Sequence, residues 1–140
     1  MAFTPYLTFD GNCKEAFEWY AEVLGGSIVA MMRFRDEPSC AGMPEEVQDK
    51  IMHARLQFRD SLLMASDLPM GEYVQPQSVH VAIDFGDTAT AKAVFGQFAD
   101  GGEVSMPFDK TFWTEGFGIV RDRFGVLWMV NVANPDSPYY

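Results

Sequence analysis

Three side chains stand out as groups that could do acid–base chemistry in this 140-residue chain: the two histidines, His53 and His80, and Lys110. An imidazole can exchange a proton near neutral pH or bind a metal ion, and a lysine ammonium can hold an anionic or carbonyl oxygen. The chain has no Gly-x-Ser-x-Gly elbow, and no motif places a serine or cysteine beside either histidine. Nucleophilic catalysis therefore has no support from the sequence.

Each histidine allows two interpretations. His53 lies in the strand pattern IMHARLQF, where alternation puts Ile51, Arg55 and Gln57 on the same face. That polar face is either the wall of a cavity or the solvent side. His80, in HVAIDF, is either a former metal ligand or acid–base group in a cavity, or a half-buried histidine satisfied by a hydrogen bond. The second interpretation is the more common one for a lone histidine.

A polar, aromatic loop from Lys110 to Glu115 precedes the last strands of the chain. Trp113 could supply a flat apolar wall and Lys110 a cation at the mouth of a binding cavity. Alternatively, the loop is structural and its aromatic residues anchor it. We favour the mouth of a cavity, because Phe112 and Trp113 beside charged groups are unusual in a simple connection. Phe117, which follows the loop, is included among the cavity residues.

The elements that must position these residues form two similar sets. In the first, Asn12 is expected to cap a helix, with Glu15 completing a capping box, and Gly25–Gly26 to end it. Cys13 is expected at the start of this helix, where the helix dipole would lower its pKa. The polar segment 35–49 is expected to be a long loop or a lid. The expected strands are 2–9, 27–34, 51–58 and 61–65.

The second set repeats this order. Its expected elements are a strand at 79–85, a helix capped by Asp87 and ended by Gly101–Gly102, a strand at 103–106 and a hairpin at 116–132. An offset of 76 residues aligns the two glycine pairs and places Thr4 on His80. In the hairpins, an offset of 65 residues places Met64 on Met129. A duplicated βαβββ unit explains both offsets.

The sequence therefore predicts an α+β fold in which two paired βαβββ modules form a curved mixed sheet around a cavity. One domain is expected over residues 1–140. Its parts are module one at 1–67, a linker at 68–77, module two at 78–133 and a C-terminal tail at 134–140.

Three segments carry a resemblance to a known family. They are PYLTFDGNCKEAFEWYAEVLGG, IMHARLQFRDSLLMASD and KTFWTEGFGIVRDRFGVLWMVN. They resemble the PhnB-like branch of the glyoxalase/bleomycin-resistance/dioxygenase superfamily, also called vicinal oxygen chelate proteins. The resemblance implies the glyoxalase-like fold, a small organic ligand in a cavity between the modules, and a homodimer.

The metal positions implied by the resemblance can be examined one at a time. Metal-dependent members hold a divalent ion with one ligand from the first and one from the last strand of each module. These positions fall on Thr4 (or Pro5), His80, Met64 and Met129. Only His80 is a credible ligand, because a thioether is a poor partner for Mg, Mn, Zn or Ni. No cofactor is expected, and a catalytic divalent metal is disfavoured.

Composition excludes several classes of partner. The net charge is −10 and the calculated pI about 4.4, so the basic stripe of a nucleic-acid binder is missing and anionic membranes are disfavoured. No apolar run approaches the roughly 20 residues of a membrane span, and the N-terminus lacks the basic region of a signal peptide. Cys13 and Cys40 form neither a metal spacing nor a disulfide framework. A cytoplasmic location is expected.

The expected function is the binding of a small molecule in the cavity between the modules. Its candidate residues are His53, His80, Met64, Met129, Lys110, Trp113 and Phe117. The alternative is a metal-dependent or His/Lys-based lyase, isomerase or dioxygenase that acts on a small oxygenated substrate. A scaffold protein with a collapsed cavity is a third possibility. The sequence assigns no catalytic residue and names no reaction.

Overall fold

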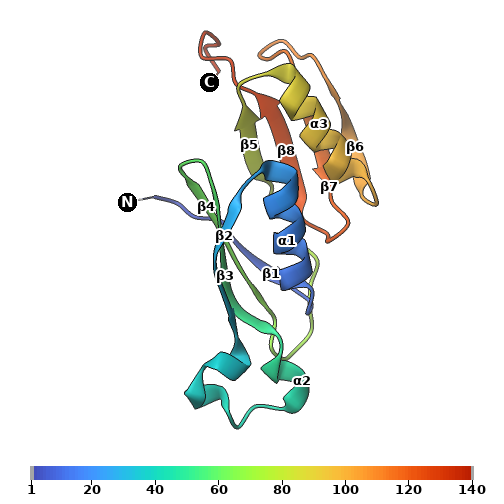
Figure 1. Ribbon diagram of the computed structural model, residues 1–140. Helices are drawn as coiled ribbons and strands as arrows, with labels where there is room; N and C mark the ends of the chain where they lie inside the picture. Colours follow the sequence, from blue (N-terminus) through green and yellow to red (C-terminus); the bar gives the residue numbers. More distant parts are fainter. Residues whose placement is uncertain (1, 140) are drawn as a thin grey trace. The chain divides into compact units, whose positions relative to one another are not determined.

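The computed structural model describes residues 2–139, which form two compact units that divide between Val74 and Gln75. The ends of the expected domain, Met1 and Tyr140, lie outside the described residues. Each unit consists of a four-stranded mixed sheet with one long helix across one face (Figure 1). The predicted α+β class and the two βαβββ modules are confirmed.

The two units share one order of elements. The first contains β1 (Tyr6–Phe9), α1 (Cys13–Leu24), β2 (Ser27–Arg33), two 3-10 turns (Phe34–Asp36 and Pro38–Cys40), α2 (Glu45–Gln48), β3 (Ile51–Phe58) and β4 (Ser61–Asp67). The second contains β5 (Val81–Phe85), α3 (Thr88–Ala99), β6 (Glu103–Asp109), β7 (Phe117–Arg121) and β8 (Leu127–Val132). The segment between β2 and β3, with α2, has no helical counterpart between β6 and β7.

The register of the sheets confirms the internal repeat. Strand order is β1-β4-β3-β2 in the first sheet and β5-β8-β7-β6 in the second, and the outer pairs β1/β4 and β5/β8 are parallel. Tyr6 lies opposite Met64, and Ala82 lies opposite Met129. The offsets of 76 and 65 residues carry the first pair onto the second. The two offsets taken from the sequence therefore predict the β5/β8 pairing of the second sheet from the β1/β4 pairing of the first.

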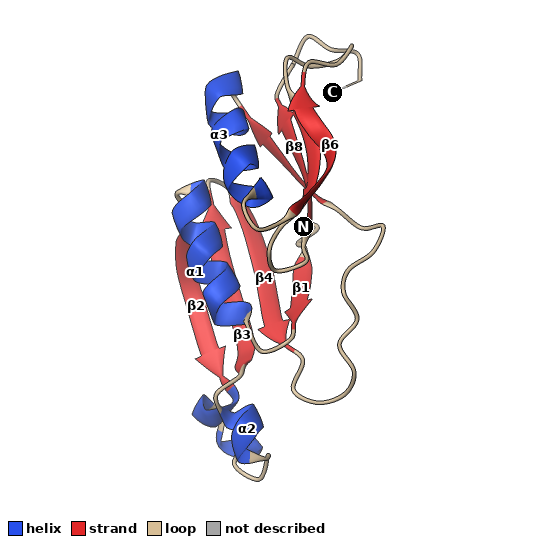
Figure 2. Ribbon diagram, turned by 90° about the vertical axis from the view of Figure 1, so that its right-hand side faces the viewer, coloured by secondary structure: helices blue, strands red, loops and turns tan. Residues whose placement is uncertain are grey.

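The core of the first unit lies between α1 and one face of its sheet (Figure 2). Apolar residues at helical spacing on α1 meet alternate residues of β3 and β4, and each large buried side chain contributes about 1.5–3 kcal/mol. Gly25 closes α1 in the left-handed conformation, with φ of 67°, as predicted. The buried residues of this core include Phe9, Ala16, Phe17, Tyr20, Val23, Ala54, Leu56, Leu63 and Ala65.

The core of the second unit lies between α3 and its sheet. The Phe98 ring stacks on Trp128, with ring centroids 4.6 Å apart. A Cβ atom on Gly118 would lie 2.6 Å from Cε2 of Phe95, so this close helix–sheet contact requires glycine. The predicted cap of α3 is confirmed, because the Thr90 N–H donates to Asp87 Oδ1 at 2.8 Å.

The predicted cap of α1 is wrong in its chemistry. Asn12 occupies the cap position, but its side chain makes no capping hydrogen bond. The Cys13 N–H donates instead to Asp67 Oδ1 at 2.9 Å, and the Ile51 N–H donates to Asp67 Oδ2 at 2.8 Å. Asp67 is only 2 % exposed. A carboxylate from the end of β4 thus ties the start of α1 to the start of β3, a long-range contact that no local pattern reveals.

The expected low pKa of Cys13 is also wrong. Burial of the thiol, reinforced by the negative charge of Asp67, raises the pKa of Cys13 to about 12. The helix dipole does not prevail, because a thiolate in this place would be desolvated beside a carboxylate. Cys13 is therefore a packed, protonated thiol.

Several strand limits differ from those expected. β1 begins at Tyr6 rather than Ala2, and the Pro5 carbonyl accepts a hydrogen bond from the Met64 N–H at 3.1 Å. β4 continues to Asp67, because it pairs with β1 along its last residues. β6 reaches Asp109, where it still pairs with β7. β5 begins at Val81 rather than Val79.

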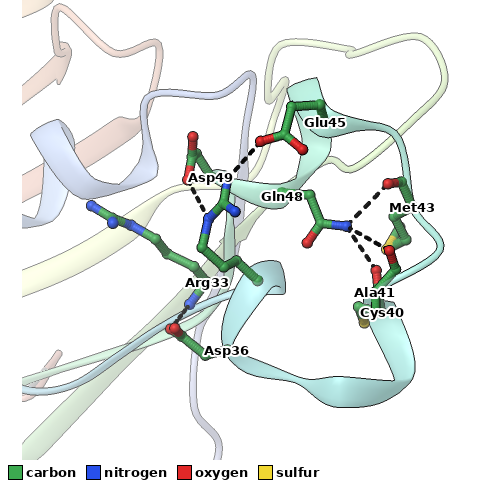
Figure 3. Close-up of polar contacts among 9 residues, drawn as sticks. Arg33, Asp36, Cys40, Ala41, Met43, Glu45, Gln48 and Asp49 are labelled. Atoms are coloured by element: carbon green, nitrogen blue, oxygen red, sulfur yellow. Dashed lines mark hydrogen bonds and ion pairs between the residues drawn. The ribbon is translucent and has the colours of Figure 1, made fainter.

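The segment 35–49 is more regular than the expected loop. The Arg35 guanidinium bridges Asp49, at 2.8 Å, and Glu45, at 3.1 Å. The hydrogen bond from Arg35, with the positive charges of Arg35 and Arg33, holds the pKa of Asp49 below its usual range. Inside the segment, the Gln48 side chain reaches three backbone carbonyls (Figure 3): those of Cys40, Ala41 and Met43. These contacts give the segment a defined shape.

Over residues 2–139, none of the helices has the length and apolar character that crossing a membrane requires.

Candidate functional site

Each sheet has one face covered by the long helix of its unit and a second face, here called the open face. Alternation along the strands decides which side chains lie on it, because facing residues in the register share a side. On the first open face, half-buried and exposed residues alternate with the buried ones of the core. The first open face carries Tyr6, His53, Arg55, Gln57, Leu62 and Met64. The second open face carries Asp84, Phe117, Ile119, Arg121, Met129 and Asn131.

On the first open face, His53 pairs with a tyrosine from β1. Tyr6 Oη lies 3.2 Å from His53 Nδ1, and the two rings stack with centroids 5.8 Å apart. The hydroxyl either donates to Nδ1 or accepts its proton, depending on the tautomer. Met64 lies opposite both Tyr6 and Arg55 in the register. The structure therefore brings His53 and Met64 to one face, with Tyr6 orienting the imidazole.

On the second open face, a methionine and an asparagine follow one another along β8. Met129 lies opposite Ala82 and Ile119. Asn131 lies opposite Asp84 and Phe117, and its Nδ2 donates to Asp84 Oδ1 at 2.9 Å. This face joins apolar and polar groups next to the aromatic ring of Phe117.

The loop before β7 is held by its own polar contacts. Trp113 meets Phe117 edge to face, with centroids 5.2 Å apart, so the tryptophan extends the aromatic side of the second open face. Asn134 Nδ2 donates to the Trp113 carbonyl at 2.9 Å. Lys110 Nζ lies 2.9 Å from Glu115 Oε1, and both side chains are 67 % exposed. The lysine charge is thus paired within the loop, although an exposed pair of this kind is weak.

The four positions that the resemblance connects with a metal are distributed over both units, and two of them lie in strands. Met64 and Met129 occupy equivalent places in β4 and β8, each opposite the parallel first strand. His80 is half-buried and lies just before β5, and Thr4 holds the equivalent place before β1. Within residues 2–139, no three His, Cys, Asp or Glu side chains gather where they could hold a metal ion. The chemistry of the two thioethers remains the argument against a metal at these positions.

Three residues of the open faces escaped the sequence reasoning: Tyr6, Asp84 and Asn131. A signal for Asn131 existed, since it is the one polar residue in the β8 segment LWMVNV and stands two positions after Met129. By the same alternation, Asp84 falls two positions after Ala82. The repeat makes Tyr6 equivalent to Ala82, but the positions of Tyr6 beside Met64 and against His53 depend on the order and register of the strands.

Comparison with known proteins identifies the family. Residues 3–130 match the Glyoxalase/Bleomycin resistance protein/Dioxygenase superfamily. Protein YjdN of Escherichia coli strain K12 is 33 % identical over 142 aligned positions, which cover 95 % of this chain and 96 % of that protein.

Solved structures share the fold. Protein PA1353 from Pseudomonas aeruginosa is 44 % identical, with a TM-score of 0.86 over 94 % of this chain and 97 % of that one. The PhnB protein from Bacillus cereus, 20 % identical, has a TM-score of 0.79 over 95 % of this chain and 100 % of that one. The superfamily named from the three sequence segments is confirmed: the chain belongs to the Glyoxalase/Bleomycin resistance protein/Dioxygenase superfamily.

Proposed function

We propose that this chain is a PhnB-like protein that binds a small organic molecule against the open face of a sheet. One observation carries the proposal. Apolar, half-buried side chains stand on both open faces beside a few oriented polar groups, which is the lining typical of a small-molecule site. Met64 and Met129 stand at two of the positions that the resemblance connects with a metal, and a thioether is a poor ligand for Mg, Mn, Zn or Ni, so the proposed binding uses shape and hydrogen bonds rather than a metal.

A ligand screen with matched variants tests this proposal. A library of small aromatic and oxygenated compounds is screened against the purified protein by ligand-observed NMR, and the dissociation constants of the hits are measured. Met129→Lys places a charge on the second open face, whereas Gln97→Lys places the same charge on the exposed side of α3. Binding should weaken at least tenfold in the first variant and stay unchanged in the second. A library without hits, or hits that both variants bind as the wild type does, would overturn the proposal.

The alternative is an enzyme, a lyase, isomerase or dioxygenase acting on a small oxygenated substrate. The observation that favours it is the Tyr6–His53 pair, which presents an oriented imidazole on an open face. Such a group can act as a general acid or base. Elemental analysis of the purified protein, with the melting temperature measured in added Zn, Ni, Mn or Fe, tests the metal-dependent form. Turnover that disappears in His53→Gln would identify the metal-free form.

We also propose that the protein is a cytoplasmic homodimer, as the family resemblance suggests. Light scattering coupled to size exclusion measures the mass directly. A mass of about 15.7 kDa, that of one chain, would refute the dimer.

A further inference from the structure

The second open face contains a buried hydrogen-bond acceptor without a donor. Among the described residues 2–139, Oδ1 of Asn131 is the buried side-chain nitrogen or oxygen atom that has no hydrogen-bond partner. Asn131 is only 9 % exposed. Buried polar atoms are almost always paired, because the loss of water as a partner costs free energy. An unpaired amide oxygen on this face therefore calls for an explanation.

The orientation of this amide is determined by its neighbour. Asn131 Nδ2 donates to the Asp84 carboxylate at 2.9 Å. Rotating the amide by half a turn would place its oxygen against the carboxylate oxygen, which repels it. The nitrogen therefore faces β5, and the oxygen faces away from Asp84. The unpaired acceptor is a consequence of the Asp84 contact and not of an arbitrary choice between two orientations.

The surroundings of this oxygen are aromatic on one side and acidic on the other, and a guanidinium lies farther along the same face. Phe117 lies opposite Asn131 in β7, and Trp113 packs against Phe117 at 5.2 Å between centroids. Asp84 adds a carboxylate on the other side of Asn131. The guanidinium of Arg121, on the same face, donates at 2.9 Å to the carbonyls of Pro76 and Gly125.

We propose that Asn131 Oδ1, with Asp84 beside it, accepts a hydrogen bond from a donor group of a ligand whose apolar or aromatic body lies against Phe117. An ammonium or hydroxyl group fits this subsite, and a carboxylate does not. The ammonium is favoured because the Asp84 charge and the net charge of −10 both attract a cation. This inference rests on the proposed function and specifies the chemistry of the ligand.

A series of four compounds that share a phenyl ring tests the donor requirement. Benzylamine and benzyl alcohol carry donors, benzaldehyde carries only an acceptor, and benzoate carries an anion. Dissociation constants are measured by ligand-observed NMR for the wild type, Asn131→Leu and Asp84→Asn. We expect benzylamine to bind at least tenfold more tightly than benzaldehyde to the wild type, and benzoate to bind most weakly.

The two variants separate the roles of the acceptor and the charge. Asn131→Leu keeps the volume but removes the acceptor, so benzylamine and benzyl alcohol should lose about tenfold in affinity while benzaldehyde does not. Asp84→Asn keeps an acceptor for Asn131 Nδ2 and removes the charge, so benzylamine should weaken and benzyl alcohol should not. Asn131→Leu also removes the hydrogen bond from Nδ2 to the Asp84 carboxylate, so its melting temperature should fall; a single cooperative thermal transition above the assay temperature shows that the variant folds.

The outcomes that overturn the inference are distinct. If the wild type bound all four compounds with equal affinity, or if Asn131→Leu left the affinities unchanged, the inference would be overturned. Binding of small molecules by the protein would still stand in that case. If neither this series nor any compound of the wider library bound, the proposed function and the inference would fall together.

Discussion

Replacement of Asp67 by asparagine should strongly destabilise the first unit. The side chain is 2 % exposed and accepts two backbone hydrogen bonds, from Cys13 at 2.9 Å and from Ile51 at 2.8 Å. These bonds tie the first residue of α1 and the first residue of β3 to the last residue of β4. Asp67→Asn has nearly the same shape, so the change isolates the chemistry of the two oxygens.

The magnitude follows from the two contacts. An asparagine keeps one acceptor oxygen and turns its NH2 group toward the second N–H, which is then buried without a partner. Losing one hydrogen bond to a charged group and leaving a donor unpaired costs about 2–4 kcal/mol. For a chain of this size, that corresponds to a melting temperature lower by roughly 6–16 °C.

The assay is urea and thermal unfolding followed by far-ultraviolet circular dichroism. Asp60→Asn is the matched control, because Asp60 is exposed in the turn between β3 and β4 and undergoes the same change of charge. The control should stay within about 0.5 kcal/mol of the wild type. If Asp67→Asn is no less stable than Asp60→Asn, the argument that a buried carboxylate joins these three elements is refuted.

Three further perturbations test other parts of the structure. Between pH 8 and pH 10, the free energy of unfolding of the wild type should fall by about 1–2 kcal/mol more than that of Cys13→Ala. The reason is that the thiol of the unfolded chain ionises in this range, while the folded one, with a pKa of about 12, stays protonated. Equal losses in urea titrations of the two proteins would contradict this. Gly26→Ala should cost about 1–3 kcal/mol, because its Cβ would lie 2.7 Å from a β3 carbonyl oxygen, whereas Gly42→Ala, in open space, should be neutral by the same measurement. Arg35→Gln should raise the pKa of Asp49 toward the ordinary value of about 3.9, which carbon-13 NMR of the carboxyl measures; an unchanged pKa would show that Arg35 is not the cause.

Local pattern was sufficient for most of the fold. Helical spacing of apolar residues, an aspartate cap at Asp87 and a left-handed glycine at Gly25 act over one or two turns of chain, and the structure contains the helices they predict. The repeat added information of longer range, since two offsets implied that Met64 and Met129 hold equivalent places. The predicted limits of strands were less accurate, because a strand extends only as far as it pairs with its neighbour, and the neighbour is not known from the local sequence.

Interactions between distant residues could not be predicted in this way. The cap of α1 comes from Asp67 at the end of β4 rather than from the adjacent Asn12, since a buried carboxylate can accept two backbone donors at once. Burial of the thiol, reinforced by the charge of the same carboxylate, reversed the expected direction of the Cys13 pKa. Both errors have one origin: the local rules omitted the tertiary packing that buries the start of α1 against a carboxylate more than fifty residues away along the chain.

The sequence by itself determined the family and the duplicated βαβββ plan, because these depend on residue type and spacing. Only the tertiary structure decided which side chains meet on an open face. It paired Tyr6 with His53 and Asp84 with Asn131, and it left the Asn131 oxygen buried without a donor among the described residues 2–139. The reason is physical: a hydrogen bond depends on the order and register of strands, and these are decided by the packing of the whole sheet.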